Sequence, residues 1–596
     1  MAARRAGRAL PAALVVLALL LVAGGIALAL SVGGATEDAP GDSPVETSAT
    51  PDLGPNVTIL DPTMDAATVQ ARVDAVFDAQ ESNQFGERRD ALLFAPGEYD
   101  VTVDVGFSTS VLGLGLSPDD VTIRGKVRVD AAWFDGNATQ NFWRSVENLA
   151  IEPSGGVNRW AVAQAAPMRR VHVRGALDLY PSGSGWASGG YIADSRVDAR
   201  VSSGSQQQWF TRDSTLGGWD GSSWNMVFSG VAGAPPPSFP HPPFTVLDST
   251  PVSREKPFLY LDERGGYRVF LPQLRRDSAG DSWSSGGTPG RSLGIDRFFV
   301  ARPGDGADEI NKALDAGLDL LLTPGVYRLD DTIEIERADT VVLGIGLATL
   351  VPQGGVDAMT VADVDGVRLA GFLIDAGPEN SEVLLRIGGE GASERHDANP
   401  VTVQDVFFRI GGAGAGRATT SLVVDSADTI VDHIWAWRAD HGDGVGWQEN
   451  TADTGVVVNG DNVVATGLFV EHYQRDQLVW NGENGRTVFF QNEMPYDPPD
   501  QESWRDGGTD GFAAYRVGEH VARHQLWGAG SYCFFDVDPS VRAERAFAVP
   551  DAPEVRLRGV LTVSLGGRGS IAHVVNSTGD AVGPGSIGPS SVGSYP

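Results

Sequence analysis

Short runs of alternating apolar and polar residues, broken by Gly, Asp and Asn, recur along the chain from about residue 57. Examples are VTIRGKVRV at residues 121–129, VTVQDVFF at 401–408 and TIVDHIWAW at 429–437. This alternation predicts short β-strands, and the lack of interleaved helical patterns argues against a βαβ fold. An irregular spacing of roughly 20 to 35 residues favours the rungs of a parallel β-helix over a sandwich, with propeller blades as the alternative.

The chain contains two halves with one plan. DALLFAPGEY at residues 90–99 matches LDLLLTPGVY at 318–327, and SVLGLGL at 110–116 matches VVLGIGL at 341–347. A short helical pattern precedes each match, ATVQARVDAVF at 67–77 and ADEINKALDA at 307–316. A solenoid must cover the open apolar end of its first coil, so each helix is expected to act as a cap.

These patterns divide the chain into six regions. Residues 57–232 form a first β-helix domain and residues 300–578 a second one. Residues 233–299 form a linker that contains a Pro-rich stretch and a hairpin with its turn at Gly265 and Gly266. The linker also contains a Gly/Ser-rich stretch that is either disordered or draped on the surface. Residues 579–596, rich in Gly, Ser and Pro, are expected to form a flexible tail.

The N-terminus carries an export signal. Residues 9–36 have no charged side chain and follow three arginines, as a signal peptide or a membrane anchor does. We therefore assign residues 1–36 to this segment and the acidic, Pro- and Ser-rich residues 37–56 to a flexible tether. Whether the segment is cleaved off or retained as an anchor, we expect a protein that is extracellular or anchored to a membrane and facing outside.

Charge and cysteine content narrow the possible partners. The net charge of −32 disfavours nucleic acid, because its phosphates would be repelled, whereas neutral sugars would not be. The single cysteine, Cys533, cannot form an intrachain disulfide and lies beside two phenylalanines. We expect it to be a buried apolar residue.

Two carboxylates stand out in the stretches GLFVEHYQRDQLVW at 467–480 and TVFFQNEMPY at 487–496. Glu471 and Glu493 each end an apolar run and lie 22 residues apart, about one coil of a β-helix, so both should lie on one face. Two carboxyls in different surroundings can hold different pKa values, as glycosidic cleavage requires. The alternative is that both are solvated residues at strand ends.

Several segments in the two halves resemble glycoside hydrolase family 55, the tandem β-helix β-1,3-glucanases. The segments are NFWRSVENLAI at 141–151, WAVAQA at 160–165, ASGGYIAD at 187–194, GSQQQ at 204–208, IWAWRADH at 434–441, VEHYQ at 470–474 and NEMPY at 492–496. The resemblance implies two tandem right-handed parallel β-helices of the pectate-lyase-like type, an all-β fold in which each β-helix has a short N-terminal capping helix.

The same resemblance implies roles for individual residues. Glu493 would be the general acid, and Glu471 would polarise the attacking water with the help of Gln164 and Ser188. Inversion needs carboxyls about 6.5 to 9.5 Å apart, whereas carboxyls on adjacent rungs could approach to about 5 Å; we follow the resemblance and expect inversion. Candidate sugar-binding residues complete the predicted site: Gln207, Gln208, Asp440, Trp447, Tyr473, Gln474 and Tyr496.

We therefore predict a glycoside hydrolase that cleaves β-1,3-glucan or a related polysaccharide, without a metal or cofactor, as a monomer. A non-catalytic surface protein that binds glycan in the same cleft is the alternative. A polysaccharide lyase is the third hypothesis, although the matched motifs contain neither a calcium cluster nor a basic proton acceptor.

Overall fold

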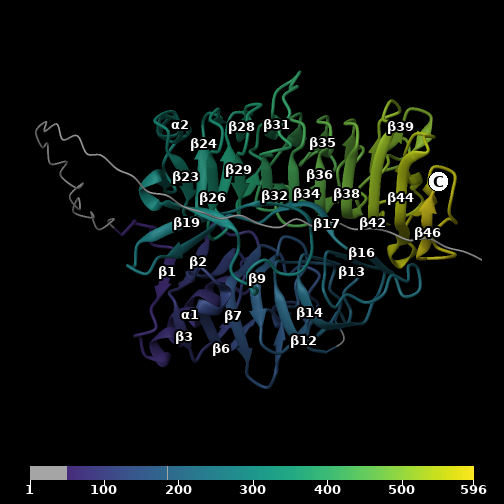
Figure 1. Ribbon diagram of the computed structural model, residues 1–596. Helices are drawn as coiled ribbons and strands as arrows, with labels where there is room; N and C mark the ends of the chain where they lie inside the picture. The colour runs from purple at the N-terminus through teal and green to yellow at the C-terminus, as the bar shows by residue number, and fades with distance from the viewer. Residues whose placement is uncertain (1–49, 184) are drawn as a thin grey trace, which may run out of the picture. The chain divides into compact units, whose positions relative to one another are not determined.

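The computed structural model describes residues 50–183 and 185–596. In this part of the chain, parallel strands stack into two β-helices joined by antiparallel strands (Figure 1). The predicted export segment, residues 1–36, lies outside the described residues. Within the described ranges, no helix has the length and apolarity needed to cross a membrane.

The first β-helix is built on a sheet that faces the second one. Its strands are β1 (Val57–Leu60), β2 (Asp90–Phe94), β5 (Thr109–Gly113), β7 (Arg144–Pro153), β9 (Met168–Val173), β11 (Tyr191–Ala193), β13 (Gln208–Arg212), β15 (Asn225–Ser229) and β16 (Phe244–Leu247). The remaining faces are formed by β3 (Gly97–Tyr99), β4 (Thr102–Asp104), β6 (Val121–Arg128), β8 (Val157–Arg159), β10 (Ala176–Asp178), β12 (Arg196–Ser202) and β14 (Thr215–Asp220). Because β16 continues this sheet, the first β-helix extends past the predicted boundary at residue 232.

The second β-helix has longer and more regular strands. One sheet contains β22 (Phe298–Ala301), β23 (Asp319–Leu322), β26 (Val341–Gly344), β29 (Arg368–Ala370), β32 (Thr402–Ile410), β34 (Ile430–Arg438), β36 (Val464–Glu471), β38 (Gly485–Glu493), β42 (Arg523–Cys533), β44 (Glu554–Ser564) and β46 (Ser590–Tyr595), joined by β24 (Val326–Leu329), β27 (Thr349–Pro352) and β30 (Leu373–Asp375). A second sheet contains β25 (Ile333–Ile335), β28 (Met359–Val361), β31 (Ser381–Ile387), β33 (Ala418–Val424), β35 (Thr454–Val458), β37 (Leu478–Trp480), β41 (Tyr515–Val517), β43 (Arg542–Ala548) and β45 (Ser570–Val575).

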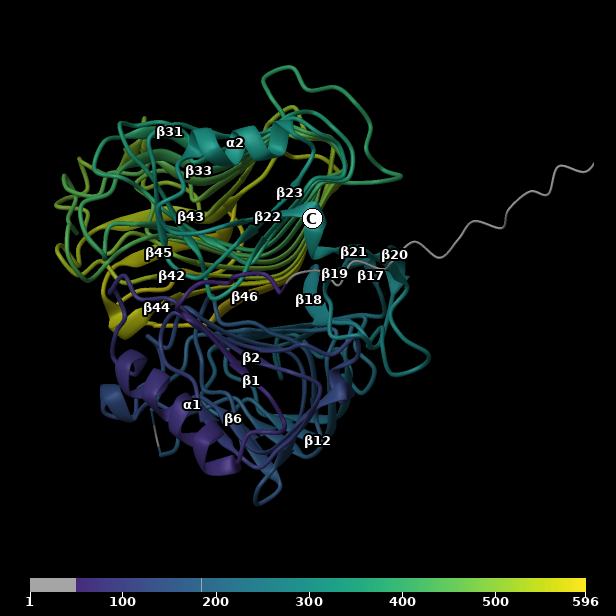
Figure 2. The ribbon, with the colours of Figure 1, turned by 90° about the vertical axis from the view of Figure 1, so that its left-hand side faces the viewer.

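Both capping helices are present, α1 (Ala66–Gln80) and α2 (Ala307–Asp315), one at the end of each stack (Figure 2). Helix α1 buries Val69, Val73 and Val76 against the first core, and α2 buries Ile310 and Leu314 against the second. The predicted caps are therefore confirmed, and each covers apolar side chains that the first coil would otherwise expose.

The repeated sequence makes the same bonds in both halves. The Tyr99 hydroxyl donates to the carbonyls of Leu60 and Ala95, at 2.9 and 2.8 Å. The Tyr327 hydroxyl donates to those of Ala301 and Thr323, both at 2.9 Å. The two matched segments thus close equivalent first turns.

The linker is folded rather than extended. Strands β18 (Phe258–Leu261) and β19 (Tyr267–Pro272) form the predicted hairpin, extended by β21 (Gly290–Gly294), and β17 (Thr250–Arg254) pairs with β20 (Leu274–Ser278). The Gly/Ser-rich stretch drapes on the first β-helix: the Trp283 indole is buried and donates to the Asp194 carbonyl at 2.8 Å.

Two predictions of flexible segments are wrong. Strand β46 pairs antiparallel with β44, so residues 590–595 of the predicted tail cover the last rung of the second β-helix. At the other end, Leu53 is buried and Asp52 pairs with Arg302 at 2.6 Å, so the described end of the predicted tether is packed. Both segments bind strands or side chains far away in the sequence, which local composition does not reveal.

A column of residues with positive φ runs along the face of the second β-helix that meets the first. Its members are Asp405, His433, Gly467, Phe489, Gly528 and Gly559, with φ between 50° and 70°. These bends bring the two backbones together, because a Cβ on Gly528 would lie 2.4 Å from the Val227 side chain. The His433 ring instead stacks on Tyr191 with centroids 4.2 Å apart.

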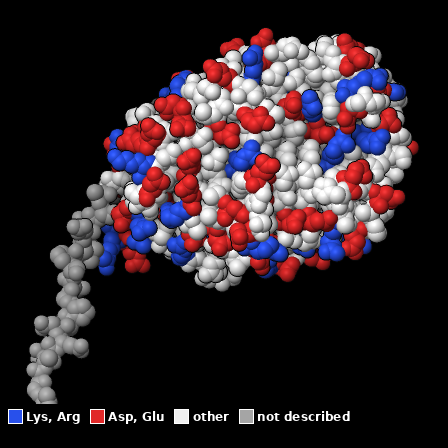
Figure 3. Space-filling view, turned by 90° about the horizontal axis from the view of Figure 1, so that it is seen from above, with Lys and Arg blue, Asp and Glu red and all other residues white. Residues whose placement is uncertain are grey.

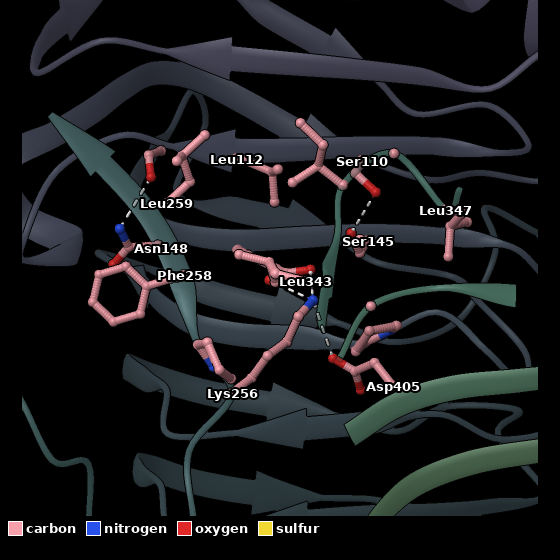
Figure 4. Close-up of a pocket in the computed structure, with 18 of the residues that line it drawn as sticks. Ser110, Leu112, Ser145, Asn148, Lys256, Phe258, Leu259, Leu343, Leu347 and Asp405 are labelled. Atoms are coloured by element: carbon pink, nitrogen blue, oxygen red, sulfur yellow. Dashed lines mark hydrogen bonds and ion pairs between the residues drawn. The ribbon is translucent and has the colours of Figure 1, made fainter. Parts of the chain in front are cut away.

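Charged side chains also pack between the two β-helices. This interface ion cluster consists of Glu147, Arg169, Arg212, Glu255, Lys256, Asp405 and Asp432. The Lys256 ammonium donates to both carboxylate oxygens of Glu147 at 2.7 and 2.9 Å. It also lies 3.5 Å from the Asp405 carboxylate (Figure 4). The halves are therefore joined by paired buried charges as well as by apolar packing.

The outer surface is polar and the lone cysteine is internal. On the face shown in Figure 3, acidic and basic side chains are interspersed, with many carboxylates exposed. Cys533 is fully buried, as predicted, and its burial raises the pKa of the thiol to about 12. A thiol held protonated in this way is a poor nucleophile.

Candidate active site

Glu471 and Glu493 lie at the ends of adjacent strands, β36 and β38. The register pairs Val464 with Arg486 and Phe469 with Gln491, a displacement of 22 residues that carries through to the two glutamates. The His472 amide donates to the Glu493 carbonyl at 2.8 Å, which fixes this end of the rung. The prediction that one coil separates the two acids is confirmed.

The first β-helix reaches this pair with two polar side chains. The Gln164 amide donates to Oε1 of Glu471 at 2.8 Å, across 307 residues of sequence. The Ser188 hydroxyl donates to the Gln164 Oε1 at 3.1 Å and so fixes the orientation of that amide. Gln164, Ser188 and Glu471 are brought together as predicted.

Neighbouring side chains hold the two carboxyls. The Trp435 indole on β34 donates to Oε2 of Glu471 at 2.8 Å. The Tyr496 hydroxyl donates to Oε2 of Glu493, and its ring lies 4.4 Å from that of His472. Burial raises the pKa of Tyr496 well above its usual range, so the phenol remains a donor.

Burial and mutual repulsion prevent both glutamates from being charged together. Burial, followed by the nearby charge of Glu493, raises the pKa of Glu471 well above its usual range. Burial also raises the pKa of Glu493, against the opposing effects of His472 and Tyr496. The pair therefore retains a proton at a pH where isolated glutamates have lost theirs.

The two carboxyls differ in the hydrogen bonds that they accept. Both oxygens of Glu471 accept bonds from N–H groups, one of them the indole of Trp435, which can only donate. Glu493 accepts one hydrogen bond, from the Tyr496 hydroxyl. Donors on both oxygens favour the ionised form of Glu471, although its burial and the charge of Glu493 act in the opposite direction.

The two glutamates open into a hollow of about 280 Å³ between the β-helices. Residues from both halves line it: Thr139, Gln140, Phe142, Gln164, Ser188 and Gln207 from the first, and Trp435, Trp437, Asp440, His441, Glu471, His472, Glu493, Tyr496 and Leu565 from the second. Aromatic faces and convergent polar groups in one concave site suit a sugar, which has apolar C–H faces and a rim of hydroxyls.

Among the predicted sugar-binding residues, Gln207, Asp440 and Tyr496 line this hollow. The prediction for Tyr473 is wrong, because its ring is fully buried in the second core and its hydroxyl bonds Ser421 at 2.6 Å. The prediction for Gln208 is also wrong, because its side chain is buried and donates to the Ser188 carbonyl.

Gln474 and Trp447 also lie outside the hollow. The Gln474 amide donates to the Trp447 carbonyl at 2.8 Å and accepts from the Ala452 amide, so it serves the fold of a neighbouring turn. The Trp447 ring packs beside Arg438, whose guanidinium carbon lies 5.6 Å from the centroid of the ring.

Beyond the strand ends, the side chains that face the hollow do not follow strand alternation. His472, rather than Tyr473, faces the hollow, because Glu471 ends β36 and His472 adopts a φ of 68°. Asp440 and His441 both line the hollow, although alternation allows only one, because they follow the end of β34.

His441, His472, Trp435, Trp437 and Phe142 also line the hollow but were not among the predicted site residues. Nearness in the sequence could have indicated most of them, because all but Phe142 lie within a few residues of a predicted site residue. The His441 imidazole bonds Asp440 at 2.9 Å. This bond and the charge of His472 hold the pKa of Asp440 below its usual range, although burial acts in the opposite direction.

Within the described ranges, no group of three or more His, Cys, Asp or Glu side chains is arranged to hold a metal ion.

Comparison with known proteins identifies close relatives. The LAM55 pectate lyase-like domain family matches residues 298–493, which end at Glu493. An exo-β-1,3-glucanase of Streptomyces sp. (strain SirexAA-E / ActE) is 58% identical over 546 residues, covering 91% of this chain and 90% of that protein.

Two solved structures have the same fold. The structure of sacteLam55A from Streptomyces sp. SirexAA-E superposes with a TM-score of 0.91 at 58% identity, covering 92% of this chain and 100% of that one. A glutamate-to-alanine variant of sacteLam55A in complex with glucose gives a TM-score of 0.90 at 57% identity over the same shares of the two chains.

Proposed function

The chain belongs to glycoside hydrolase family 55, and from this premise we propose that it hydrolyses β-1,3-glucan from a chain end by single displacement with inversion. One observation carries the proposal: the acid Glu493 and the group Glu471–Gln164–Ser188 converge on one hollow from two β-helices. Such an arrangement places a proton donor and acceptors for water around one sugar ring.

The reaction needs one proton donor and one activated water. Glu493 donates its proton to the glycosidic oxygen as the bond to the anomeric carbon breaks. The Glu471 carboxylate, with Gln164 and Ser188 beside it, orients the water that attacks the opposite face and takes up its proton. One water is consumed per bond, and the product carries the α configuration.

The surroundings lower the barrier by electrostatics. Positive charge develops on the sugar ring in the transition state, and the Glu471 carboxylate lies in a desolvated site where its field is little screened. The rings of Trp435 and Trp437 line the same hollow, and the π electrons of an aromatic ring favour positive charge. The hollow is thus better matched to the transition state than to the neutral substrate.

The proposal also covers where the enzyme acts, its oligomeric state and the end of the glucan that it attacks. The export segment predicted for residues 1–36 supports a protein that acts outside the cytoplasm, where polymeric glucan is found. The site takes all its named groups from one chain, which supports a functional monomer. Attack at the chain end is supported by the exo-β-1,3-glucanase of Streptomyces sp..

The test is digestion of laminarin followed by proton NMR of the first product formed. We expect α-glucose to be released before mutarotation mixes the anomers. Initial release of β-glucose would contradict inversion. Retention on insoluble glucan without product would favour the glycan-binding alternative, and an absorbance rise near 235 nm on a polyuronate substrate would favour the lyase.

A further inference from the structure

A second hollow lies along the same interface, on rungs nearer the capping helices. It measures about 230 Å³ and is lined by residues that include Phe85, Gln353, Asp375, Arg409 and Ala413. It shares no lining residue with the catalytic hollow. Arg409, on β32, lies one rung before the tryptophans of β34 that line the catalytic hollow.

Phe85 separates the two hollows. Its ring lines the second hollow and stacks on Trp437 of the catalytic hollow, with centroids 6.2 Å apart and planes inclined by 5°. Its edge meets His441 of the catalytic hollow at 5.4 Å, and the Arg409 guanidinium lies 5.7 Å from its centroid on the side of the second hollow. One side chain thus contacts residues of both sites.

This ring is fixed in place by its surroundings. A Cβ on Gly412 or Gly442 would lie 2.8 Å from the Phe85 ring, so two turns of the second β-helix close around it. The preceding residue, Gln84, is buried, and its amide nitrogen lies 2.7 Å from Nε2 of His441. The segment just after α1 therefore inserts a ring from the first half into the loops of the second.

We propose that Phe85 is the partition that ends the catalytic hollow and restricts the enzyme to chain ends. The inference rests on the proposed function. An internal glucan segment must continue on both sides of the bond that is cleaved, and a ring stacked on Trp437 leaves no path on one side. Phe85 is a specificity-determining residue and takes no part in the chemistry.

The second hollow is suited to receive the continuing chain once the partition is removed. The Arg409 guanidinium and Asp375 carboxylate form a bidentate pair at 2.7 and 2.7 Å at its wall, and small residues of the 411–415 turn line it. Paired polar groups beside small apolar surfaces are typical of carbohydrate contacts. Loss of the Phe85 ring would join two hollows of similar size into one groove.

Phe85→Ala tests this with a glucan whose ends are blocked. Periodate cleaves vicinal diols, which 3-linked internal glucosyl units lack, so it oxidises laminarin only at its ends. Wild type and the control Phe512→Ala, a half-buried ring that packs against Trp504 outside the interface, should leave oxidised laminarin intact. Phe85→Ala should raise the release of new reducing ends by about tenfold or more.

Each internal cleavage consumes one water and creates one reducing and one non-reducing end, so product length gives a second readout. Phe85→Ala should release oligomers of mixed length from unmodified laminarin, whereas Phe85→Tyr should retain the wild-type product pattern. A folded Phe85→Ala that still acts only on free ends, or that loses activity on both glucans, would overturn the inference. Wild type that fails on unmodified laminarin would refute the proposed function itself.

Discussion

The interface between the two β-helices holds two kinds of buried carboxylate. Asp432 of the interface ion cluster accepts from Arg212 at 2.9 Å and lies 3.0 Å from Arg169, and these guanidiniums hold its pKa at about 2 although burial opposes the shift. Glu471, on the next strand, has only neutral donors on its oxygens, and burial raises its pKa.

The comparison shows that the partner decides the role of a buried acid. A guanidinium makes the carboxylate a permanent anion that joins the halves, whereas amide, indole and hydroxyl donors leave it able to share a proton with a second acid. Chemistry at neutral pH requires the second kind of environment. The three predictions below test this division, from the largest expected effect to the smallest.

Glu493→Gln should reduce kcat by about 10²- to 10⁴-fold, because it removes the proposed proton donor. The side chain keeps its shape, and the amide can still accept from Tyr496, so the thermal midpoint should not fall. Initial rates on laminarin and a thermal scan check both points. Activity close to that of wild type would exclude Glu493 as the general acid.

Arg212→Met should lower the free energy of unfolding by about 3 to 5 kcal/mol, because it leaves the buried acids Asp432 and Glu255 without a principal partner. Arg200→Met removes an exposed guanidinium 3.5 Å from Asp220 and should cost at most about 1 kcal/mol. Chemical denaturation of both variants measures the difference. Equal losses of unfolding free energy would show that a buried ion pair of the cluster contributes no more to stability than an exposed one.

The two kinds of carboxylate should also give opposite pH dependences of stability. Asp432 stabilises the fold above about pH 3.9, the usual aspartate value, and this contribution is lost as pH falls toward its folded pKa of about 2. The raised pKa of Glu493 destabilises the fold as pH rises from about 4.3. Thermal midpoints measured from about pH 4 to 8 should therefore increasingly favour Glu493→Gln over wild type.

Asp432→Asn supplies the matched contrast. Its deficit against wild type should be constant from neutral pH down to about 3.9 and shrink as pH falls from there toward the folded pKa of about 2. A constant difference for both variants from about pH 2 to 8 would mean that neither group titrates differently in the folded and unfolded states.

Much of the architecture follows from sequence periodicity, because it depends on local patterns. Period-two alternation located the rungs, the matched segments at 90–99 and 318–327 revealed the two halves, and the helices α1 and α2 lie where their apolar spacing placed them. The spacing of 22 residues put Glu471 and Glu493 on neighbouring rungs. These features need no knowledge of how the halves pack.

Local patterns failed where the chain leaves a regular strand. Tyr473 would share a face with Glu471 if strand alternation continued past the end of β36, but the positive φ of His472 turns His472 toward the hollow instead. The composition of residues 579–596 predicts a flexible tail, yet β46 is held by backbone hydrogen bonds to β44. Pairing of this kind is invisible in composition.

The sequence by itself determined the two β-helices, their caps and the spacing that aligns two glutamates. Only the tertiary structure decided that Glu471 meets Gln164 while Asp432 meets Arg212, since these partners lie 307 and 220 residues away. The physical reason is that a carboxylate's proton affinity depends on burial and on the nearest charge. Both are set when one half of the chain docks against the other.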